Sequence, residues 1–176
     1  MAIALLAVLA LAVPARAWAA VEIAFYSREL GSSFPHAFVT LKGTLDRTGE
    51  PIDQSFGFTA KAVTPAVLMG SVGGKVITES ADYIARSDRQ FALTIDDARY
   101  DAVMRVVATW RDRAQPSYDL NRRNCVHFVG ELAQAAGLAV DFQQQLMKKP
   151  RSFLIAVRED NRSMLDRAAE LAPATR

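Results

Sequence analysis

Extended segments fill the first half of this chain, and segments with helical periodicity fill the second half. The extended segments are rich in β-branched and aromatic residues; they are Val21 to Leu30, His36 to Leu45, Asp53 to Lys61, Lys75 to Ser80 and Arg89 to Ile95. Turn residues from Asp46 to Pro51 join the second and third segments into a hairpin. Strands grouped before helices favour an α+β fold, with a small antiparallel sheet packed on helices.

The helical segments follow in order along the second half. A helix is expected from Asp96 to Ala114 because its apolar residues recur at intervals of three and four. A second helix holds Cys125 and ends at Gly137, a residue type common just after a helix. After Pro150, residues 151–171 predict one or two terminal helices that form a C-terminal tail.

Residues 1–20 predict a secretory signal peptide. The apolar run Met1 to Val13 is shorter than the roughly 20 residues that span a bilayer. Ala17 to Ala19 has the small-x-small pattern that a signal peptidase accepts. We therefore expect a periplasmic or secreted protein with no stable membrane span after cleavage, and a single mature domain over residues 21–176.

Charge and size restrict the partners that this chain can have. The chain has 176 residues, enough for one ordinary domain, and a formal net charge of +2. Both signs of charge are spread along the sequence, with no basic stripe of the kind that binds nucleic acid. No nucleic-acid partner is expected.

The single cysteine, Cys125, lies two residues before His127, one of only two histidines. One cysteine cannot form an internal disulfide in an oxidising compartment, so either a reactive role or packing as a small buried hydrophobic residue must account for it. A zinc site needs three or four ligands, and a Cys-x-His step on a helix directs its side chains about 200° apart. Neither a metal nor another cofactor is expected.

The same helical geometry argues against Cys125 and His127 acting as a catalytic pair. Cys125 shares its helix face with the apolar residues Phe128, Val129 and Leu132 and is expected to point inward. His127 lies on the side of Glu131 and Gln134, where a structural role is expected.

His36 is the remaining candidate partner for Cys125, at the start of an expected strand. The positive end of the helix that begins near Asn124 favours a thiolate, and an imidazolium from His36 would pair with it. The same histidine could then protonate a leaving group. The alternative is a strand-end histidine with no chemical role.

The stretch "NCVHF", Asn124 to Phe128, resembles the Asn-Cys-x-His-Phe motif of circularly permuted papain-like proteins. These include lecithin:retinol acyltransferase-like enzymes and permuted NlpC-type bacterial proteins. Their histidine begins a strand early in the chain, and their cysteine begins a later helix, as in "HAFVTLKG" followed by "NCVHFVGEL" here. The resemblance implies a permuted papain-like fold, with Cys125 as nucleophile, His36 as general base and His127 as a structural residue.

The resemblance also implies a third polar residue that orients the histidine, often on the next strand. Here that strand is "DQSFGFTAK", which has no His, Asn or Glu. A hairpin turn near Gly49 brings His36 opposite residues 59–61, so Thr59 is the expected orienting residue, unless a backbone carbonyl or water serves instead. Tyr118 resembles a tyrosine that lies beside the site in some NlpC-type enzymes, where it could stabilise an oxyanion; it could equally be a loop aromatic packed on the core.

These features predict an exported cysteine hydrolase, an amidase or peptidase, that acts by Cys–His acyl transfer. The resemblance suggests cell-wall peptides as substrates. A lipid or thioester acyltransferase of the same fold is the alternative enzyme. A catalytically silent periplasmic binding domain is the alternative outside enzymes, supported by the absence of a clear third residue.

Overall fold

The computed structural model describes residues 20–29, 34–62, 64–114 and 117–171. Six strands form the sheet: β1 (Val21–Arg28), β2 (His36–Thr44), β3 (Pro51–Ala60), β4 (Val72–Ile77), β5 (Asp88–Ile95) and β6 (Ser117–Tyr118). The helices are α1 (Ala66–Met69), α2 (Ala81–Ala85), α3 (Asp97–Arg111), α4 (Cys125–Ala135), α5 (Pro150–Asp160) and α6 (Arg162–Leu171), with a 3₁₀ turn at Gln144–Leu146. The expected α+β class is confirmed. The predicted signal peptide lies almost entirely outside the described residues.

The sheet has the strand order β5-β1-β2-β3-β4-β6, and every pair of neighbours is antiparallel. The expected hairpin of β2 and β3 pairs Phe38 with Gly57 and Thr44 with Pro51. Gly49 in its turn has φ +71°, a conformation that glycine adopts without strain. Continuing the same register places His36 opposite Thr59, as the turn position predicted.

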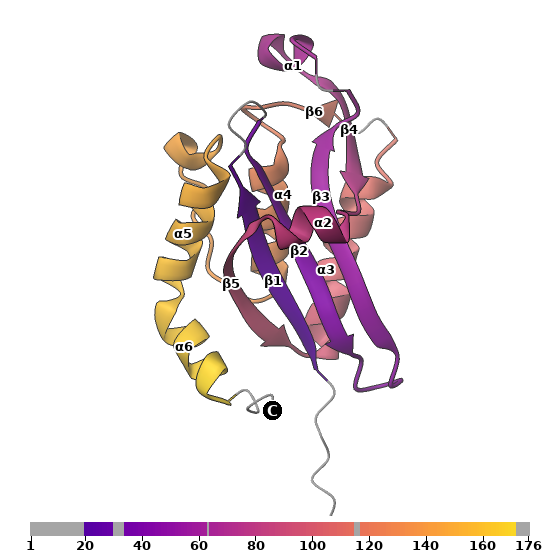
Figure 1. The fold of residues 1–176 in the computed structure, drawn as a ribbon, viewed down its shortest axis with the longest axis vertical. Helices are drawn as coiled ribbons and strands as arrows, with labels where there is room; N and C mark the ends of the chain where they lie inside the picture. The colour runs from indigo at the N-terminus through magenta and orange to yellow at the C-terminus, as the bar shows by residue number, and fades with distance from the viewer. Residues whose placement is uncertain (1–19, 30–33, 63, 115–116, 172–176) are drawn as a thin grey trace, which may run out of the picture.

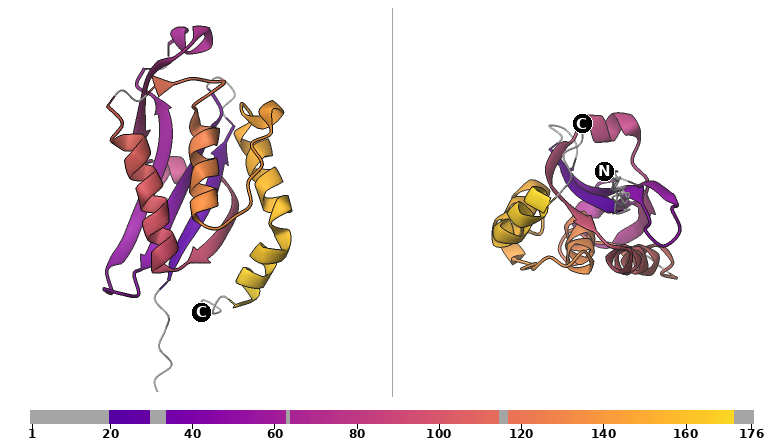
Figure 2. Two further views of the ribbon diagram at one scale, coloured as in Figure 1. Left: turned by 180° about the vertical axis from the view of Figure 1, so that it is seen from behind. Right: turned by 90° about the horizontal axis from the view of Figure 1, so that it is seen from below.

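Helices cover the two faces of the sheet unequally (Figures 1 and 2). The helices α3, α4 and α5 lie side by side on one face, with α4 over β2 and β3 and α5 over β1 and β5. The short helix α2 crosses the opposite face (Figure 1). This arrangement follows from the strand pattern, because Ala37, Val39 and Leu41 of β2 alternate with residues of the other face and belong to the main core.

The core between sheet and helices contains a cluster of aromatic rings. The Phe58 ring on β3 lies 4.7 Å from that of Trp110 on α3, 5.8 Å from that of Tyr118 on β6 and 6.2 Å from that of Phe128 on α4. A smaller cluster on the other face stacks Phe38 on Tyr26 and against Tyr83 of α2. Among the described residues, no helix combines the length and the apolar character needed to cross a membrane.

Two elements were not expected from the sequence. Helix α2 has only five residues, and β6 has two residues that pair with Val72 and Gly73 of β4. Both are too short to show a periodic pattern, and the pairing of β6 is with a strand far away in the sequence. They matter for the site, because Tyr83 lies on α2 and Tyr118 ends β6.

Candidate functional site

Cys125 is the first residue of α4, and several hydrogen bonds hold the N-terminus of this helix in place. Asn124 is the N-cap, and its Oδ1 accepts hydrogen bonds from the backbone N–H groups of Val126 and His127 at 2.9 and 3.3 Å. Its Nδ2 donates to the carbonyl oxygens of Leu120 and Met147. Asn124 thus ties the helix start to two other segments and holds Cys125 in place.

His127 belongs to this cap. Its Nδ1 lies 3.4 Å from the backbone nitrogen of Asn124 and closes a capping box. Its ring stacks on Phe142 at 6.3 Å between centroids, and burial lowers the pKa of His127 below its ordinary value. His127 therefore takes part in the helix cap, which is the structural role that was expected.

His36, the first residue of β2, is held by a carboxylate. Its Nε2 lies 3.0 Å from Oε1 of Glu79, which follows β4 by two residues. The two side chains are only 13% and 8% exposed. The backbone of Glu79 is itself held by Ser55, whose Oγ accepts from the Glu79 N–H at 2.9 Å and lies 3.3 Å from its carbonyl oxygen.

Gly57 leaves the space in which His36 and Glu79 meet. A Cβ atom at this position would lie 2.7 Å from Nε2 of His36 and 2.8 Å from Oε1 of Glu79. Both distances are far below normal carbon contacts, so any larger residue would displace the pair. The glycine on β3 is therefore required by the pair and not by the backbone conformation of the strand.

The pKa of His36 is raised to about 9. Burial alone would lower this pKa, because it disfavours the charged imidazolium. Hydrogen bonding and charge from Cys125 and from Glu79 outweigh burial and favour the protonated ring. Glu79 engages Nε2 of the ring, which leaves Nδ1 for a second partner.

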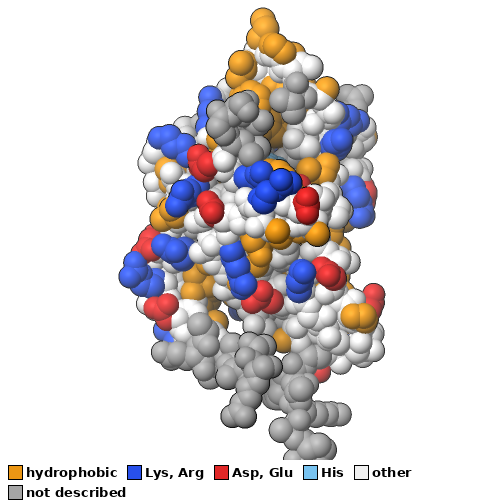
Figure 3. Space-filling model, viewed as in Figure 1, with side chains coloured by type: hydrophobic (Ala, Val, Ile, Leu, Met, Phe, Trp, Pro, Cys, Tyr) orange, Lys and Arg blue, Asp and Glu red, His pale blue; other side chains and the backbone are white. Residues whose placement is uncertain are grey.

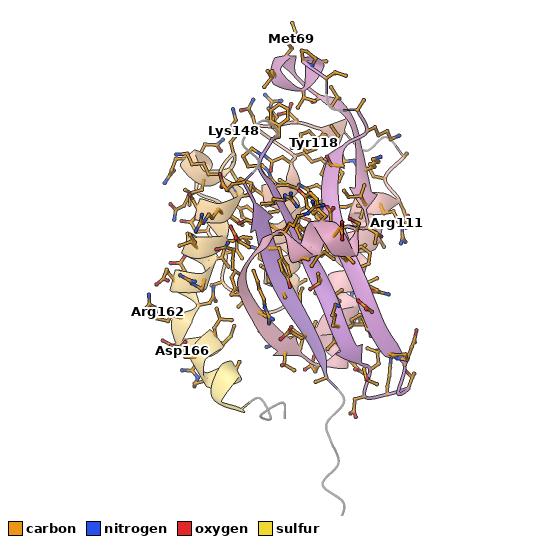
Figure 4. All side chains as sticks on the ribbon, viewed as in Figure 1. Met69, Arg111, Tyr118, Lys148, Arg162 and Asp166 are labelled. Carbon is orange, nitrogen blue, oxygen red and sulfur yellow. The ribbon has the colours of Figure 1, made fainter. Side chains whose placement is uncertain are left out.

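Two adjoining cavities form a cleft over these residues. One, of about 300 Å³, is lined by His36, Glu79 and Tyr83; the other, of about 240 Å³, is lined by Cys125. Phe34, Pro35 and Tyr118 line both cavities. The cleft lies at the end of the molecule that carries α1 and β6, near the labelled Tyr118 and Met69 (Figure 4).

Tyr118 lines the same cavity as Cys125. It is 7% exposed and stacks on Phe58, and its pKa is raised by burial and by the charge of Cys125. Tyr118 therefore packs on the core and also lines the cleft, so each of the two expected roles, a core aromatic and a residue beside the site, describes part of its surroundings.

The expected orienting residue, Thr59, requires a correction. Thr59 lines the cleft, but the hydrogen-bond partner of His36 in the structure is Glu79. The sequence argument searched only the strand next to His36, whereas the carboxylate comes from beyond the following strand and crosses over Gly57. A glycine facing the histidine and an acidic residue ending the next strand were the available signals.

Within the described part of the chain, no three His, Cys, Asp or Glu side chains gather in a way that could hold a metal ion. The described cleft instead combines a thiol, an imidazole and a carboxylate, the set of groups used for nucleophilic catalysis. No family model matches this chain, and no curated protein or solved structure shows a significant match to it.

Proposed function

We propose that this chain is an exported cysteine hydrolase of the amidase or peptidase type, with a permuted papain-like fold. The observation that carries the proposal is that Glu79 pairs with His36, whose pKa is raised by hydrogen bonding and charge from Cys125 as well as from Glu79. A nucleophile, a base and a group that orients the base are the three parts that such catalysis needs. Cys125 is the nucleophile, His36 the general base and acid, and Glu79 the positioning residue.

In the first half of the reaction, the Cys125 sulfur attacks the carbonyl carbon of the substrate. In the proposed resting state the thiol proton is on His36, because a pKa of about 9 keeps the His36 imidazolium populated at neutral pH. Tyr118 lines the same cavity as Cys125, and we assign its hydroxyl as the donor to the negative oxygen of the tetrahedral intermediate. His36 then gives its proton to the leaving amine, the carbon–nitrogen bond breaks, and a thioester remains on Cys125.

In the second half, water replaces the amine. The water oxygen attacks the thioester carbon, and His36 accepts a proton from the same water. The carbon–sulfur bond breaks, the acid product leaves, and the thiolate–imidazolium pair forms again. Glu79 stabilises the imidazolium at both stages and holds the ring in one orientation.

A lipid or thioester acyltransferase is the second candidate, and one observation favours it. The residues around Cys125 in the cleft are mostly apolar, and they are Phe34, Pro35, Leu68, Leu120, Val126, Met147 and Pro150. Such a lining suits an acyl chain better than a charged peptide. The acceptor in the second half-reaction would then be an alcohol or amine in place of water.

A silent binding domain is the third alternative. The argument for it was that no third polar residue was evident near His36. Glu79 binds His36, so this argument no longer supports a silent domain. Cell-wall peptides remain the proposed substrate class for the hydrolase, on the basis of the predicted export and the sequence resemblance.

Alkylation by iodoacetamide tests the proposal. An ordinary thiol is about 1% ionised near pH 6.5, so an ion-paired thiol should react up to about a hundredfold faster. We expect His36→Ala to abolish most of this advantage and Glu79→Ala to reduce it. Thr59→Ala is the matched control inside the same cleft and should leave the rate unchanged.

Labelling of the native chain at the rate of an ordinary thiol, unaffected by His36→Ala, would rule out the enzyme. Mass spectrometry of Cys125 after incubation with peptidoglycan peptides or with phospholipids then distinguishes the hydrolase activity from the acyltransferase activity. An acyl adduct from the phospholipid alone would favour the acyltransferase.

A further inference from the structure

The exposed large hydrophobic side chains of the described residues gather at one end of the molecule. They are Phe34, Leu68 and Met69, which are 37%, 68% and 89% exposed. Leu68 and Met69 are on α1, and Figure 3 shows the apolar tip that stands at this end. We call Phe34, Leu68 and Met69 the apolar tip. Exposed apolar side chains that are grouped in this way often mark a surface that binds a partner.

This apolar tip stands at the mouth of the cleft. Phe34 and Leu68 line the same cavity as Cys125. Whatever covers the tip would therefore lie against residues of the cavity that Cys125 lines.

The charge around the tip is basic. Lys148 lines the cavity together with Leu68, and the stem of Lys61 packs on Gly73 in the strand that follows α1. Figure 3 shows mainly Lys and Arg side chains, with some Asp and Glu among them, on both flanks beneath the tip, and Figure 4 labels Lys148 at this end. The carboxylate of Asp119 is engaged at the same end, because it accepts hydrogen bonds from Ser71 and from backbone N–H groups.

We propose that this end of the molecule docks on an anionic phospholipid surface, with Leu68 and Met69 inserted between the headgroups and Lys61 and Lys148 against the phosphates. A small convex apolar tip with basic neighbours suits the interfacial zone of a bilayer. A second protein copy is a poorer occupant, because a specific interface buries about 800 Å² on each partner. Two protruding side chains cannot provide that area.

The docking surface does not depend on the reaction at Cys125, and it can be tested without an activity assay. The full chain is mixed with vesicles of phosphatidylcholine and phosphatidylglycerol in a 3:1 ratio, or of phosphatidylcholine alone, and floated on a density gradient. We expect the anionic vesicles to carry more protein, and Met69→Asp to reduce the bound fraction about tenfold.

Thr48→Asp is the matched control, because it adds the same charge in the β2–β3 turn at the opposite end of the molecule (Figure 1). The new carboxylate can still accept from the Glu50 N–H, which Thr48 Oγ1 does at 3.2 Å. The control should bind like the native chain. Equal binding of both variants would overturn the proposal, and so would a dimer in sedimentation that Met69→Asp dissociates.

A second measurement reports the position of the tip itself. Tryptophan emission should shift to shorter wavelength on addition of anionic vesicles in Met69→Trp, beyond the shift seen in Thr48→Trp. Equal shifts in the two variants would place the contact elsewhere on the chain and overturn the proposal. Failure of the iodoacetamide test would leave these results unaffected, so docking and catalysis are judged separately.

Discussion

His36 and His127 are the only histidines of the chain, and their environments push their pKa values in opposite directions. Burial lowers the pKa of His127, whereas Cys125 and Glu79 overcome burial at His36 and raise its pKa to about 9. At neutral pH one ring is therefore charged and the other neutral. This difference allows each ring to be identified by its titration.

A nuclear magnetic resonance titration of the two imidazoles should show this separation. We expect one midpoint near pH 9 and one below the ordinary value of 6.5. Replacing the Glu79 carboxylate by an amide removes a charge that favours the imidazolium, so Glu79→Gln should move the upper midpoint down. Thr59→Ala should move neither. An upper midpoint that stays in place in Glu79→Gln would contradict the role of the carboxylate.

Gly57 provides the second test at the residue scale. In Gly57→Ala the new Cβ would overlap both His36 and Glu79, and the pair must move apart. We expect iodoacetamide labelling of Cys125 to slow about tenfold or more, because small displacements of catalytic groups are costly. The circular dichroism spectrum should remain native.

Gly73→Ala is the control, since its Cβ would meet only the flexible stem of Lys61, at 3.2 Å. If the labelling rate falls equally in both variants, the effect comes from replacing any strand glycine and not from the contact of Gly57 with His36 and Glu79.

At the scale of elements, the start of α4 connects three segments through one side chain. Asn124 caps the helix and also donates to carbonyl oxygens of the preceding turn and of the segment before α5. Because Asn124 is buried, its loss would leave these backbone groups without partners. The position of Cys125 thus depends on a buried polar residue as well as on apolar packing of α4.

Asn124→Ala should lower the free energy of unfolding by about 2–4 kcal/mol, the sum of a lost cap and of buried carbonyls left unpaired. Urea denaturation followed by circular dichroism measures the change. Asn121→Ala, at an exposed position in the same turn, should have an effect within about 0.5 kcal/mol. A similar loss in both variants would argue against the capping explanation.

For the whole molecule, Phe58 is the ring that joins the two layers. It contacts rings from α3, α4 and β6 while it belongs to β3, and it is fully buried. Tyr118, which lines the cleft, stacks on it. The position of the cleft therefore depends on the packing of sheet against helices.

Phe58→Ala should destabilise the fold by about 3–5 kcal/mol, because it removes a large buried ring and leaves a cavity. Phe58→Leu keeps more of the volume and should cost less. Guanidinium denaturation compares the two variants with the native chain. A cost below about 1 kcal/mol for Phe58→Ala would show that the layers are not joined at this ring.

The local features of this protein could be predicted from its sequence. The strands β1, β2, β3 and β5, the hairpin register and the helix that begins at Cys125 follow from alternation, turn residues and helical periodicity, which act over a few neighbouring residues. The expected segment Lys75 to Ser80 was displaced, because β4 spans Val72–Ile77. The separation of Cys125 from His127 followed from helical geometry alone. The position of His36 opposite Thr59 followed from the turn near Gly49.

Only the tertiary structure decided which residue holds His36. Glu79 reaches the imidazole because β4 pairs with β3 in one register and because Gly57 leaves room between them. Gly57 and Glu79 are visible in the sequence, but their meeting at His36 depends on contacts between distant segments. The same reason explains why β6, α2 and the exposed tip at the cleft could be recognised only in the folded chain.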